Sequence, residues 1–379
     1  MSQRELSEHR RYLADERRVA AYRAALAEVV EPADVVLDLG AGSGLLGYLA
    51  CEAGAKAVVA VDRGDIVGLG RRIAADNGYA DRITHVQALS VELELDAPVD
   101  VVVCDQIGGL VHDAGVLSFF ADARRRLLAP GGRLVPAGFR VFLAPVTFDV
   151  GRQAVDFWAS RPGGTDVGAA RALAANTEWK YHVATGDAVS LAPGDELASF
   201  PSDHDGPIAG TLRFEIGQAG RLDGFVGWFE AQMSPSVTLT NDPWSPERFD
   251  RWCNFYATDE AVDVVPGDRV RVAVDVRPRL GVVTWSTDVD HADGSRRRMR
   301  QSTLHGTLVT GATLDGHALG RPVPDSRRVD LLRAVVGLVD GTRTQADIVA
   351  ALSDRVGDGF ASRPHLEKFV RDVAALARG

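Results

Sequence analysis

Apolar positions in the first third of the chain follow two different periods. Leu13, Val19 and Tyr22 recur at the spacing of one helix face, which predicts a single helix over residues 5–30, ended by Pro32. Beyond it, short valine-rich runs alternate with helical patterns. The predicted strands cover residues 35–39, 57–61, 83–87 and 99–104, and the predicted helices cover residues 45–52, 66–77 and 116–128. Buried strands separated by helices are typical of a parallel sheet covered on both faces.

The pattern changes after Pro136, where runs typical of antiparallel strands are separated by turns. A less regular stretch between the first two of these strands contains a predicted helix over residues 169–179. Past Pro324 the periodicity is helical again and predicts three short amphipathic helices, the second beginning at Thr344 as its N-cap. The strands predicted in the middle region cover residues 140–146, 211–216, 225–233, 269–276 and 281–289. The sequence therefore predicts an α/β fold with an antiparallel barrel or sandwich and a helical C-terminal segment.

Composition narrows the class of protein. The 379 residues are 46% hydrophobic and 25% charged, with a formal net charge of −10, which favours two or three packed domains over a disordered or fibrous chain. No apolar run approaches the roughly 20 residues of a membrane span, and the charged N-terminus is unlike a secretory signal. The acidic balance disfavours nucleic acid as a partner. We therefore expect a cytoplasmic protein that binds neither membrane nor nucleic acid.

Cysteines and arginines add two smaller expectations. Cys51, Cys104 and Cys253 lie far apart, so we expect free thiols and no structural metal site. The basic run at residues 296–300 is expected to be a solvated loop or strand edge, with an anion-binding patch as the alternative.

The strand at residues 35–39 leads directly into a turn that contains Gly40, Gly42 and Gly44. Glycines let a ligand approach the backbone, and the next helix offers unpaired N–H groups. Asp38 precedes the turn, where a carboxylate repels a pyrophosphate and suits an ammonium group. Asp62 ends the next strand, where a carboxylate can accept both hydroxyls of a ribose. The combination predicts S-adenosylmethionine (SAM), and the alternative is a Rossmann-like core without a nucleotide.

Residues 9–22, HRRYLADERRVAAY, resemble the HxxxLxDxxRxxxY helix of the protein arginine N-methyltransferase family, in register with the glycine turn. The resemblance implies that Arg18 holds the SAM carboxylate, that His9 and Tyr12 cover the cofactor, and that Asp15 faces the active site. A guanidinium suits a carboxylate through two parallel hydrogen bonds, which agrees with the role of Arg18. A merely solvated helix face is the alternative.

The resemblance extends over roughly residues 8–290. Residues 99–109 are similar to the strand that opens the family's double-glutamate loop, and residues 250–252 to its Thr-His-Trp loop. By this resemblance Asn77, Leu89 and Ser90 lie beside the adenosine. The implied domains are a Rossmann-like SAM domain, a β-barrel with an inserted arm that forms a head-to-tail homodimer, and an appendage: residues 1–137, 138–321 with the arm near 152–185, and 322–379. The candidate cofactor-binding residues are His9, Tyr12, Arg18, Asp38, Gly40, Gly42, Gly44, Asp62, Arg63, Leu89 and Ser90.

The chain departs from the family at the acceptor site. The first clamping glutamate is replaced by Asp105, the second falls on Ala114, and the loop histidine is replaced by Arg251. A site without the second carboxylate should hold a guanidinium poorly. Asp105 is the best candidate to orient or deprotonate an acceptor, followed by His112 and Asp113.

Arg251 completes the candidate catalytic residues. Two roles remain open for it: a structural bridge to Asp15 or Asp105, or recognition of a substrate carboxylate.

We therefore expect a SAM-dependent methyltransferase that produces S-adenosylhomocysteine and methylates nitrogen, oxygen or aromatic carbon of a non-arginine acceptor. That acceptor is expected to be a small metabolite or modified peptide, as in natural-product tailoring. One alternative is an arginine methyltransferase with a shortened Asp105/Asp113 clamp, and another is a catalytically silent SAM-binding regulator. The segment 322–379 is similar to winged-helix domains that recognise leader peptides, and a packing or lid role is the alternative.

Overall fold

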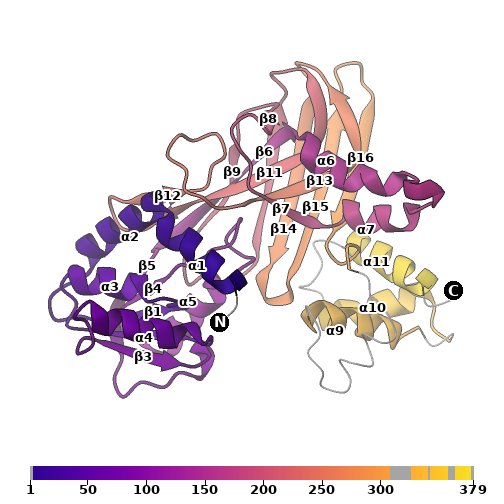
Figure 1. Cartoon of the computed structure of the whole chain (residues 1–379). Coiled ribbons are helices and arrows are strands. Elements are labelled where there is room, and N and C mark those ends of the chain that lie inside the picture. The colour runs from indigo at the N-terminus through magenta and orange to yellow at the C-terminus, as the bar shows by residue number, and fades with distance from the viewer. Residues whose placement is uncertain (1–2, 308–325, 340–341, 357–362, 377–379) are drawn as a thin grey trace. The chain divides into compact units, whose positions relative to one another are not determined.

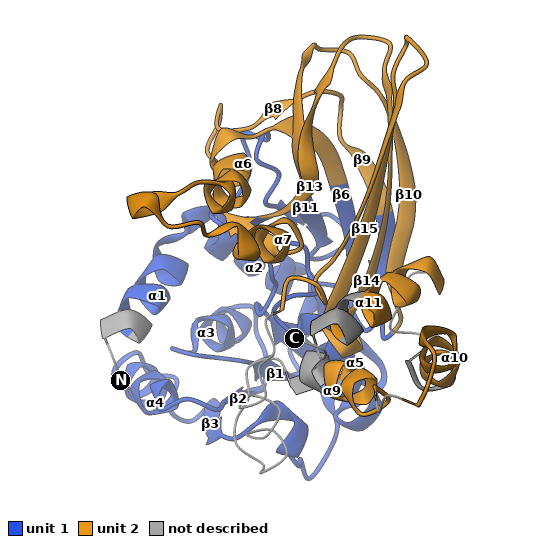
Figure 2. Ribbon diagram, turned by 90° about the vertical axis from the view of Figure 1, so that its right-hand side faces the viewer, with its two compact units in different colours: residues 1–142, 198–205, 228–253 blue, residues 143–197, 206–227, 254–379 orange. Residues whose placement is uncertain are grey.

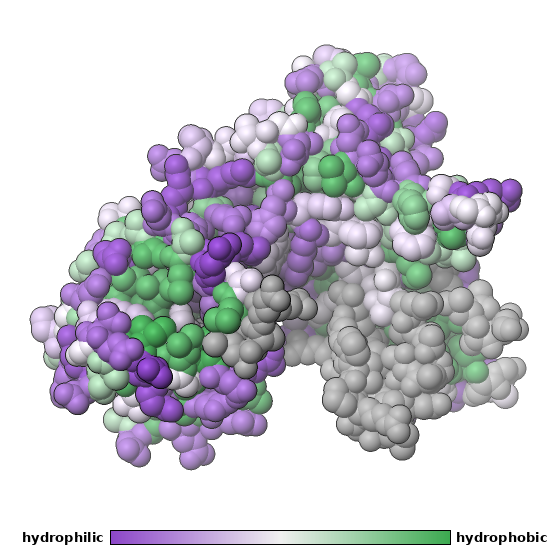
Figure 3. Space-filling view, viewed as in Figure 1, coloured by the Kyte–Doolittle hydropathy of each residue, from purple (hydrophilic) through white to green (hydrophobic). Residues whose placement is uncertain are grey.

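The computed structural model describes residues 3–307, 326–339, 342–356 and 363–376. The chain divides into two compact units, coloured separately in Figure 2. Unit 1 comprises residues 1–142, 198–205 and 228–253, and unit 2 comprises residues 143–197, 206–227 and 254–379. Polar side chains cover much of the described surface in the view of Figure 3, and apolar ones gather on the side of unit 1 near α3 and α4.

A parallel five-stranded sheet forms the centre of unit 1. Its strand order is β3-β2-β1-β4-β5, and every neighbouring pair runs parallel. The strands are β1 (Val35–Leu39), β2 (Ala57–Asp62), β3 (Ile83–Gln87), β4 (Val99–Cys104) and β5 (Leu128–Val135). Helices α3 (Leu45–Glu52), α4 (Ile66–Asp76) and α5 (Val116–Arg126) pack against it (Figure 1). The order reverses between β1 and β4, and ligands of open parallel sheets bind at the carboxyl ends of strands beside such a reversal.

The prediction of one N-terminal helix over residues 5–30 is wrong. The structure has two helices, α1 (Gln3–Ala14) and α2 (Glu16–Val29), which are separated at Asp15. The Asp15 carboxylate accepts a hydrogen bond of 3.1 Å from the Arg18 amide and so caps α2. Aspartate competes for backbone donors in this way and therefore favours helix starts over helix interiors.

Antiparallel sheets make up the middle of the chain. A four-stranded sheet of unit 2 has the order β10-β14-β15-β16, with strands β10 (Ile208–Glu215), β14 (Arg269–Arg277), β15 (Val282–Asp290) and β16 (Arg296–Ser302). Buried and more exposed residues alternate along β14, as expected for a sheet that covers a core with one face. The basic run lies on β16, where Arg296, Arg297 and Arg298 are exposed.

A second antiparallel sheet has the order β7-β13-β11-β6-β8, with β12 paired to β11 and β9 to β6. Its strands are β6 (Gly138–Thr147), β7 (Glu178–Tyr181), β8 (Val189–Ser190), β9 (Asp195–Pro201), β11 (Gly220–Gln232), β12 (Thr238–Thr240) and β13 (Cys253–Val264). The helix predicted over residues 169–179 is shorter than expected. It is α7 (Arg171–Ala175), and the chain then turns into β7 because Asn176 ends the helix.

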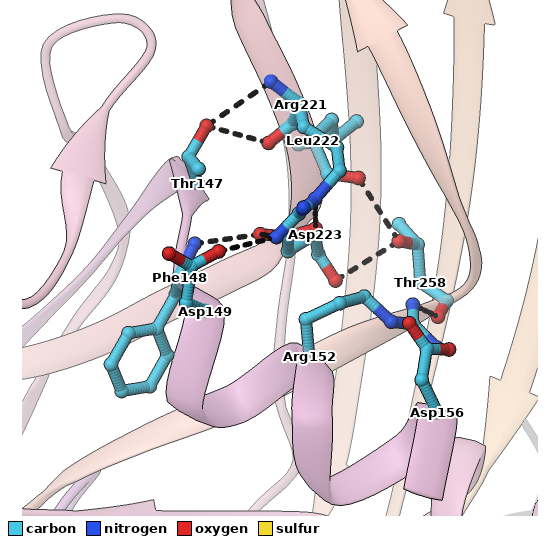
Figure 4. A network of polar contacts seen from close by, with 9 residues as sticks. All are labelled: Thr147, Phe148, Asp149, Arg152, Asp156, Arg221, Leu222, Asp223 and Thr258. Carbon is cyan, nitrogen blue, oxygen red and sulfur yellow. Dashed lines mark hydrogen bonds and ion pairs between the residues drawn. The ribbon is translucent and has the colours of Figure 1, made fainter. Parts of the chain in front are cut away.

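Buried charges hold helix α6 (Asp149–Asp156) onto unit 2 (Figure 4). The Asp223 side chain is fully buried and accepts hydrogen bonds from the Phe148 amide at 2.8 Å and from Arg221 at 2.6 Å. Buried Arg152, on the helix itself, donates to the Thr258 carbonyl at 2.9 Å. Both of these buried charges have a partner of opposite charge, because Asp223 pairs with Arg221 and Arg152 pairs with Asp156 at 2.8 Å.

Three C-terminal helices complete unit 2: α9 (Ser326–Val336), α10 (Gln345–Val356) and α11 (Arg363–Leu376). Leu352, Phe369 and Val370 from these helices share one apolar core with Val282 and Leu304 of the antiparallel region. The Thr344 hydroxyl accepts the Asp347 amide at 3.2 Å, which is the expected N-cap of α10. None of the helices in the described part of the chain is long and apolar enough to span a bilayer.

Candidate functional site

Asp38 stands in the middle strand of the parallel sheet and is fully buried. Its Oδ2 accepts a hydrogen bond of 3.0 Å from the Gly47 amide, whereas Oδ1 has no hydrogen-bond partner among the residues that the structure describes. Burial raises the pKa of this carboxyl from 3.8 to about 7. A buried carboxylate oxygen without a donor is costly, and an ammonium group supplies both the donor and the opposite charge.

The glycine turn that follows β1 adopts left-handed backbone conformations at Gly40, with φ 71°, and at Gly42, with φ 54°. A Cβ atom on Gly40 would lie 2.5 Å from Nε2 of Gln106, and one on Gly42 would lie 2.7 Å from Cε1 of His9. The His9 and Gln106 side chains therefore lie directly on the turn. Only glycine combines this backbone geometry with so close an approach.

A cavity of about 380 Å³ lies beside the turn. The Asp62 carboxylate at its wall accepts hydrogen bonds from the Gly42 amide at 3.0 Å and the Gly64 amide at 2.7 Å. Predicted cofactor residues gather in its lining, which includes Gly40, Asp62, Arg63, Leu89 and Ser90, together with Gln106, Ala114 and Phe119. Asn77 caps the end of α4 and donates to the Ile73 carbonyl at 2.9 Å, so it is not part of this lining.

The Arg18 side chain lies buried at the end of β4. Its guanidinium forms an ion pair with Asp105 and donates to the Tyr12 carbonyl at 2.6 Å, and the rings of Tyr12 and Tyr22 lie 5.6 and 6.0 Å from it. Within the described part of the chain, Arg18 Nε has no hydrogen-bond partner. One donor of a fixed guanidinium therefore remains for a further acceptor such as a carboxylate.

Asp105 binds a second guanidinium. Its Oδ1 accepts hydrogen bonds from the Tyr22 hydroxyl at 3.1 Å and from Arg251 Nη2 at 3.2 Å. The Arg251 side chain is only 4% exposed, and its guanidinium carbon lies 5.3 to 5.4 Å from the ring centres of Tyr12, Phe249 and Trp252. None of the described residues accepts a hydrogen bond from Arg251 Nε. We call this arrangement of Asp105 and the Tyr12, Phe249 and Trp252 rings the guanidinium cage.

The loop that follows Asp105 carries a second carboxylate, that of Asp113, which lies next to the 249–252 segment. Asp113 Oδ2 lies 3.5 Å from Nε1 of Trp252, a long hydrogen bond. A Cβ on Gly108 would lie 1.6 Å from Asp113 Oδ1, so a glycine is required there for the carboxylate to fit. In the same loop buried Val111 has φ 68°, an unusual conformation for a β-branched residue, and such conformations cluster at functional sites.

Further hydrogen bonds hold this loop and the 249–252 segment in place. The Asn241 side-chain amide donates to the Gly109 carbonyl at 3.0 Å and to the Trp252 carbonyl at 2.9 Å, tying the loop to the 249–252 segment. His112 Nδ1 lies 3.0 Å from the Leu110 carbonyl, which fixes the orientation of its ring. Asp15 Oδ2 accepts a hydrogen bond of 3.0 Å from the Asp250 amide. The Asp15 carboxylate therefore caps α2 and also binds the 249–252 segment.

Comparison with known proteins finds methyltransferases among the relatives of this chain. The family model for ribosomal protein L11 methyltransferase (PrmA) matches residues 23–140. Protein arginine N-methyltransferase 6 of Xenopus tropicalis is 26% identical over 73% of this chain and 86% of its own length. That of Danio rerio is 26% identical over 71% of this chain and 81% of its own length.

The solved structures that resemble it have the same fold. A chain of the Trypanosoma brucei PRMT1 enzyme-prozyme heterotetrameric complex with AdoHcy superposes with a TM-score of 0.67 and 22% sequence identity. The match covers 78% of the present chain and 97% of the chain from the complex. Arabidopsis thaliana protein arginine methyltransferase 10 matches 79% of this chain and 98% of that chain, with 17% identity and a TM-score of 0.65.

This chain is a SAM-dependent methyltransferase with the fold of the protein arginine methyltransferases. The predicted fold class, the predicted enzyme class and the predicted cofactor are thereby confirmed. The relatives named above are arginine N-methyltransferases, so they give no support to the expected non-arginine acceptor. Residue roles and domain boundaries stay predictions. No cluster of three metal-binding side chains occurs among the residues described.

Several site residues of this methyltransferase were not predicted from sequence. Tyr22, Gln106, Phe249, Trp252 and Asn241 all contact predicted site residues or connect the loops that carry them. Tyr22 and Trp252 lie inside motifs quoted for the family resemblance, so the signal for them was present. Asn241 carries no motif of its own, because its role depends on two loops that are far apart along the chain.

Proposed function

We propose that this methyltransferase transfers the methyl group of SAM to a guanidino nitrogen of arginine in a protein or peptide. The observation that carries the proposal is the guanidinium cage, in which Asp105 and three aromatic rings already surround the guanidinium of Arg251. Charge-assisted hydrogen bonds and cation–π contacts are the interactions by which proteins bind such groups. The names of the Xenopus tropicalis and Danio rerio relatives support the same acceptor.

The residues at the sheet edge fit SAM. The orphaned Asp38 Oδ1 suits its ammonium group and the remaining Arg18 donor suits its carboxylate. Asp62, in the wall of the 380 Å³ cavity, suits its ribose hydroxyls, with Leu89 and Ser90 on the adenine side. SAM held by these residues would supply an electrophilic methyl group: the acceptor nitrogen provides the electron pair of the new N–C bond, the pair of the broken S–C bond stays on sulfur, and the product is S-adenosylhomocysteine.

In this proposal Asp105 orients the acceptor nitrogen toward the methyl group. Alignment of nucleophile and electrophile supplies much of the acceleration in such displacements. The guanidinium loses one proton as the N–C bond forms, and a carboxylate is the natural recipient. Asp113 lies against Trp252 and is the candidate base and the second arm of the clamp. His112 is the next candidate for the base.

The test is methylation of arginine-containing peptides by the purified enzyme, followed by mass spectrometry that localises the methyl group. Asp105→Asn should lower kcat at least a hundredfold, because it weakens a contact that orients the reacting nitrogen. Asp81→Asn, at an exposed position, is the matched control and should leave the rate unchanged. Lysine-containing copies of each peptide test selectivity, and equal rates on both would contradict the proposal.

A second candidate acceptor carries a carboxylate beside the methylated atom. Arg251 favours it, since this buried guanidinium offsets the charge of Asp105 and its Nε donor has no partner among the described residues. Methylation of anionic metabolites in the absence of arginine methylation would establish this candidate. SAM binding without any methylated product would instead support a silent regulator. A homodimer, a cytoplasmic location and a role in natural-product tailoring stay predictions from the sequence.

A further inference from the structure

Arg251 occupies surroundings that suit a substrate guanidinium. Its side chain is 4% exposed, Nη2 donates to Asp105 Oδ1 at 3.2 Å, and Tyr12, Phe249 and Trp252 surround it. The side chain therefore satisfies the charge and aromatic contacts that the proposed function assigns to an acceptor.

Charge makes simultaneous occupancy unfavourable. Asp105 already forms ion pairs with both Arg18 and Arg251. A third guanidinium on the same carboxylate would place three like charges around one negative charge in a buried site, where repulsion is weakly screened. An acceptor guanidinium can use Asp105 at full strength only when one of the two arginines leaves it.

Arg251 is the one with the weaker attachment. Arg18 also donates to the Tyr12 carbonyl at 2.6 Å and lies on α2, whose N-cap is held by Asp15. Arg251 lies outside helices and strands, in the segment between β12 and β13, and its guanidinium is held through the hydrogen bond of 3.2 Å to Asp105. Rotation about its long side chain can move the guanidinium without any change in the parallel sheet.

We propose that Arg251 is a specificity-determining residue, an internal guanidinium that competes with the acceptor arginine for the guanidinium cage. The inference rests on the proposed function. Occupation by Arg251 lowers the apparent affinity for the acceptor in proportion to the fraction of molecules in which the cage is vacant. If Arg251 fills the cage in nine-tenths of molecules, the apparent Kd of an acceptor is raised about tenfold. Only acceptors with further contacts along the peptide then bind well.

The test compares Arg251→Ala and Arg251→Gln with the intact enzyme, using arginine peptides at saturating SAM. We expect KM for the peptide to fall about tenfold, while kcat changes less than about threefold and the Kd of SAM stays the same. A purely structural Arg251 predicts the reverse, namely a lower melting temperature with a higher KM or a lower kcat. Arg248→Ala, an arginine of the same segment, is the matched control and should leave KM unchanged.

A second measurement does not depend on catalysis. Methylguanidine should bind Arg251→Ala in calorimetric titrations at least tenfold more tightly than it binds the intact enzyme, because the truncated side chain leaves the cage to it. Equal binding to both proteins, or an unchanged KM in a variant that methylates arginine, would overturn the inference. If neither enzyme methylates arginine, the proposed function fails, and methylguanidine binding still decides whether Arg251 fills a guanidinium site.

Discussion

Replacement of Asp38 by Asn should make the protein more stable and its binding of SAM weaker. The carboxyl of Asp38 is fully buried, its Oδ1 accepts no hydrogen bond from any residue that the structure describes, and burial raises its pKa from 3.8 to about 7. Asparagine keeps the shape and can still accept the Gly47 amide through its carbonyl oxygen, but it carries no charge. The substitution therefore removes the electrostatic cost without opening a cavity.

The sign follows from proton linkage. Because the pKa of Asp38 is higher in the folded chain than in the unfolded chain, the folded chain binds this proton more tightly between pH 3.8 and about pH 7. The free energy of unfolding consequently decreases as pH rises through this window. The full difference in pKa corresponds to about 4 kcal/mol above pH 7, an upper limit that relaxation of the site reduces. We expect Asp38→Asn to recover about 2 kcal/mol or more at pH 8 and nothing near pH 3.

SAM binding should respond in the opposite direction. An ammonium group binds the ionised carboxylate, so the affinity of the intact enzyme should fall about tenfold for each pH unit below 7. Asp38→Asn should bind SAM about 10- to 100-fold more weakly at pH 8, the typical loss for a hydrogen bond between charged groups. It should also lose the part of the pH dependence that belongs to this carboxyl.

The assays are thermal unfolding and calorimetric titration with SAM at pH 6, 7 and 8, run in parallel on Asp38→Asn and on the exposed control Asp81→Asn. A variant that is less stable than the intact protein at pH 8 would refute the buried-charge argument. Unchanged SAM affinity in the variant would refute the assignment of the ammonium group to Asp38.

Other perturbations test the cofactor turn and the C-terminal helices. Gly40→Ala should cost about 1–2 kcal/mol of stability, because φ 71° is unfavourable for alanine. It should also weaken SAM binding, because the new Cβ displaces the Gln106 side chain. Thermal unfolding measures the first effect and calorimetric titration with SAM the second. Burial lowers the pKa of His305 to about 4 and also lowers that of His365. The packing of α11 against the antiparallel region should therefore be fully stable above pH 6.5 and should lose up to about 3 kcal/mol of stability as pH falls toward 4. Hydrogen exchange of the α11 amides at pH 7 and pH 4.5 measures this loss. The His305→Gln variant should lose less stability over the same pH change.

The parallel half of the fold was largely predictable, because buried strands and amphipathic helices leave strong local periodicity. Strands at residues 35–39, 83–87 and 99–104 and the helix at residues 45–52 have the predicted bounds. The N-terminal helix pair was missed because its apolar positions continue through Asp15, and only the cap reveals the break. Short strands such as β8 and β12 were missed because pairing with distant partners, rather than local propensity, creates them.

The cofactor side of the site followed from sequence better than the acceptor side. The residues predicted to bind the cofactor lie at the ends of neighbouring strands, and the common edge of a parallel sheet brings Asp38, the glycine turn and Asp62 together. The acceptor side depends on contacts between chain segments that are distant in sequence. Arg251 was proposed as a partner of Asp105 or Asp15, and the structure pairs its side chain with Asp105, whereas Asp15 accepts the backbone of Asp250.

The guanidinium cage also changes how the replacements at the acceptor site are interpreted. Counted along the sequence, Ala114 in place of a glutamate and an added arginine both weaken the case for a guanidinium acceptor. In space, Asp113 rather than Ala114 lies against Trp252, because Gly108 leaves room for its carboxylate. Arg251 adds a positive charge, but its guanidinium lies inside the cage, where Asp105 and the Tyr12 ring contact it. A positive charge placed beside the cage would repel an arginine acceptor and exclude it. A guanidinium that fills the cage instead leaves the contacts of the cage intact, and it sets only the affinity that an acceptor needs in order to displace Arg251.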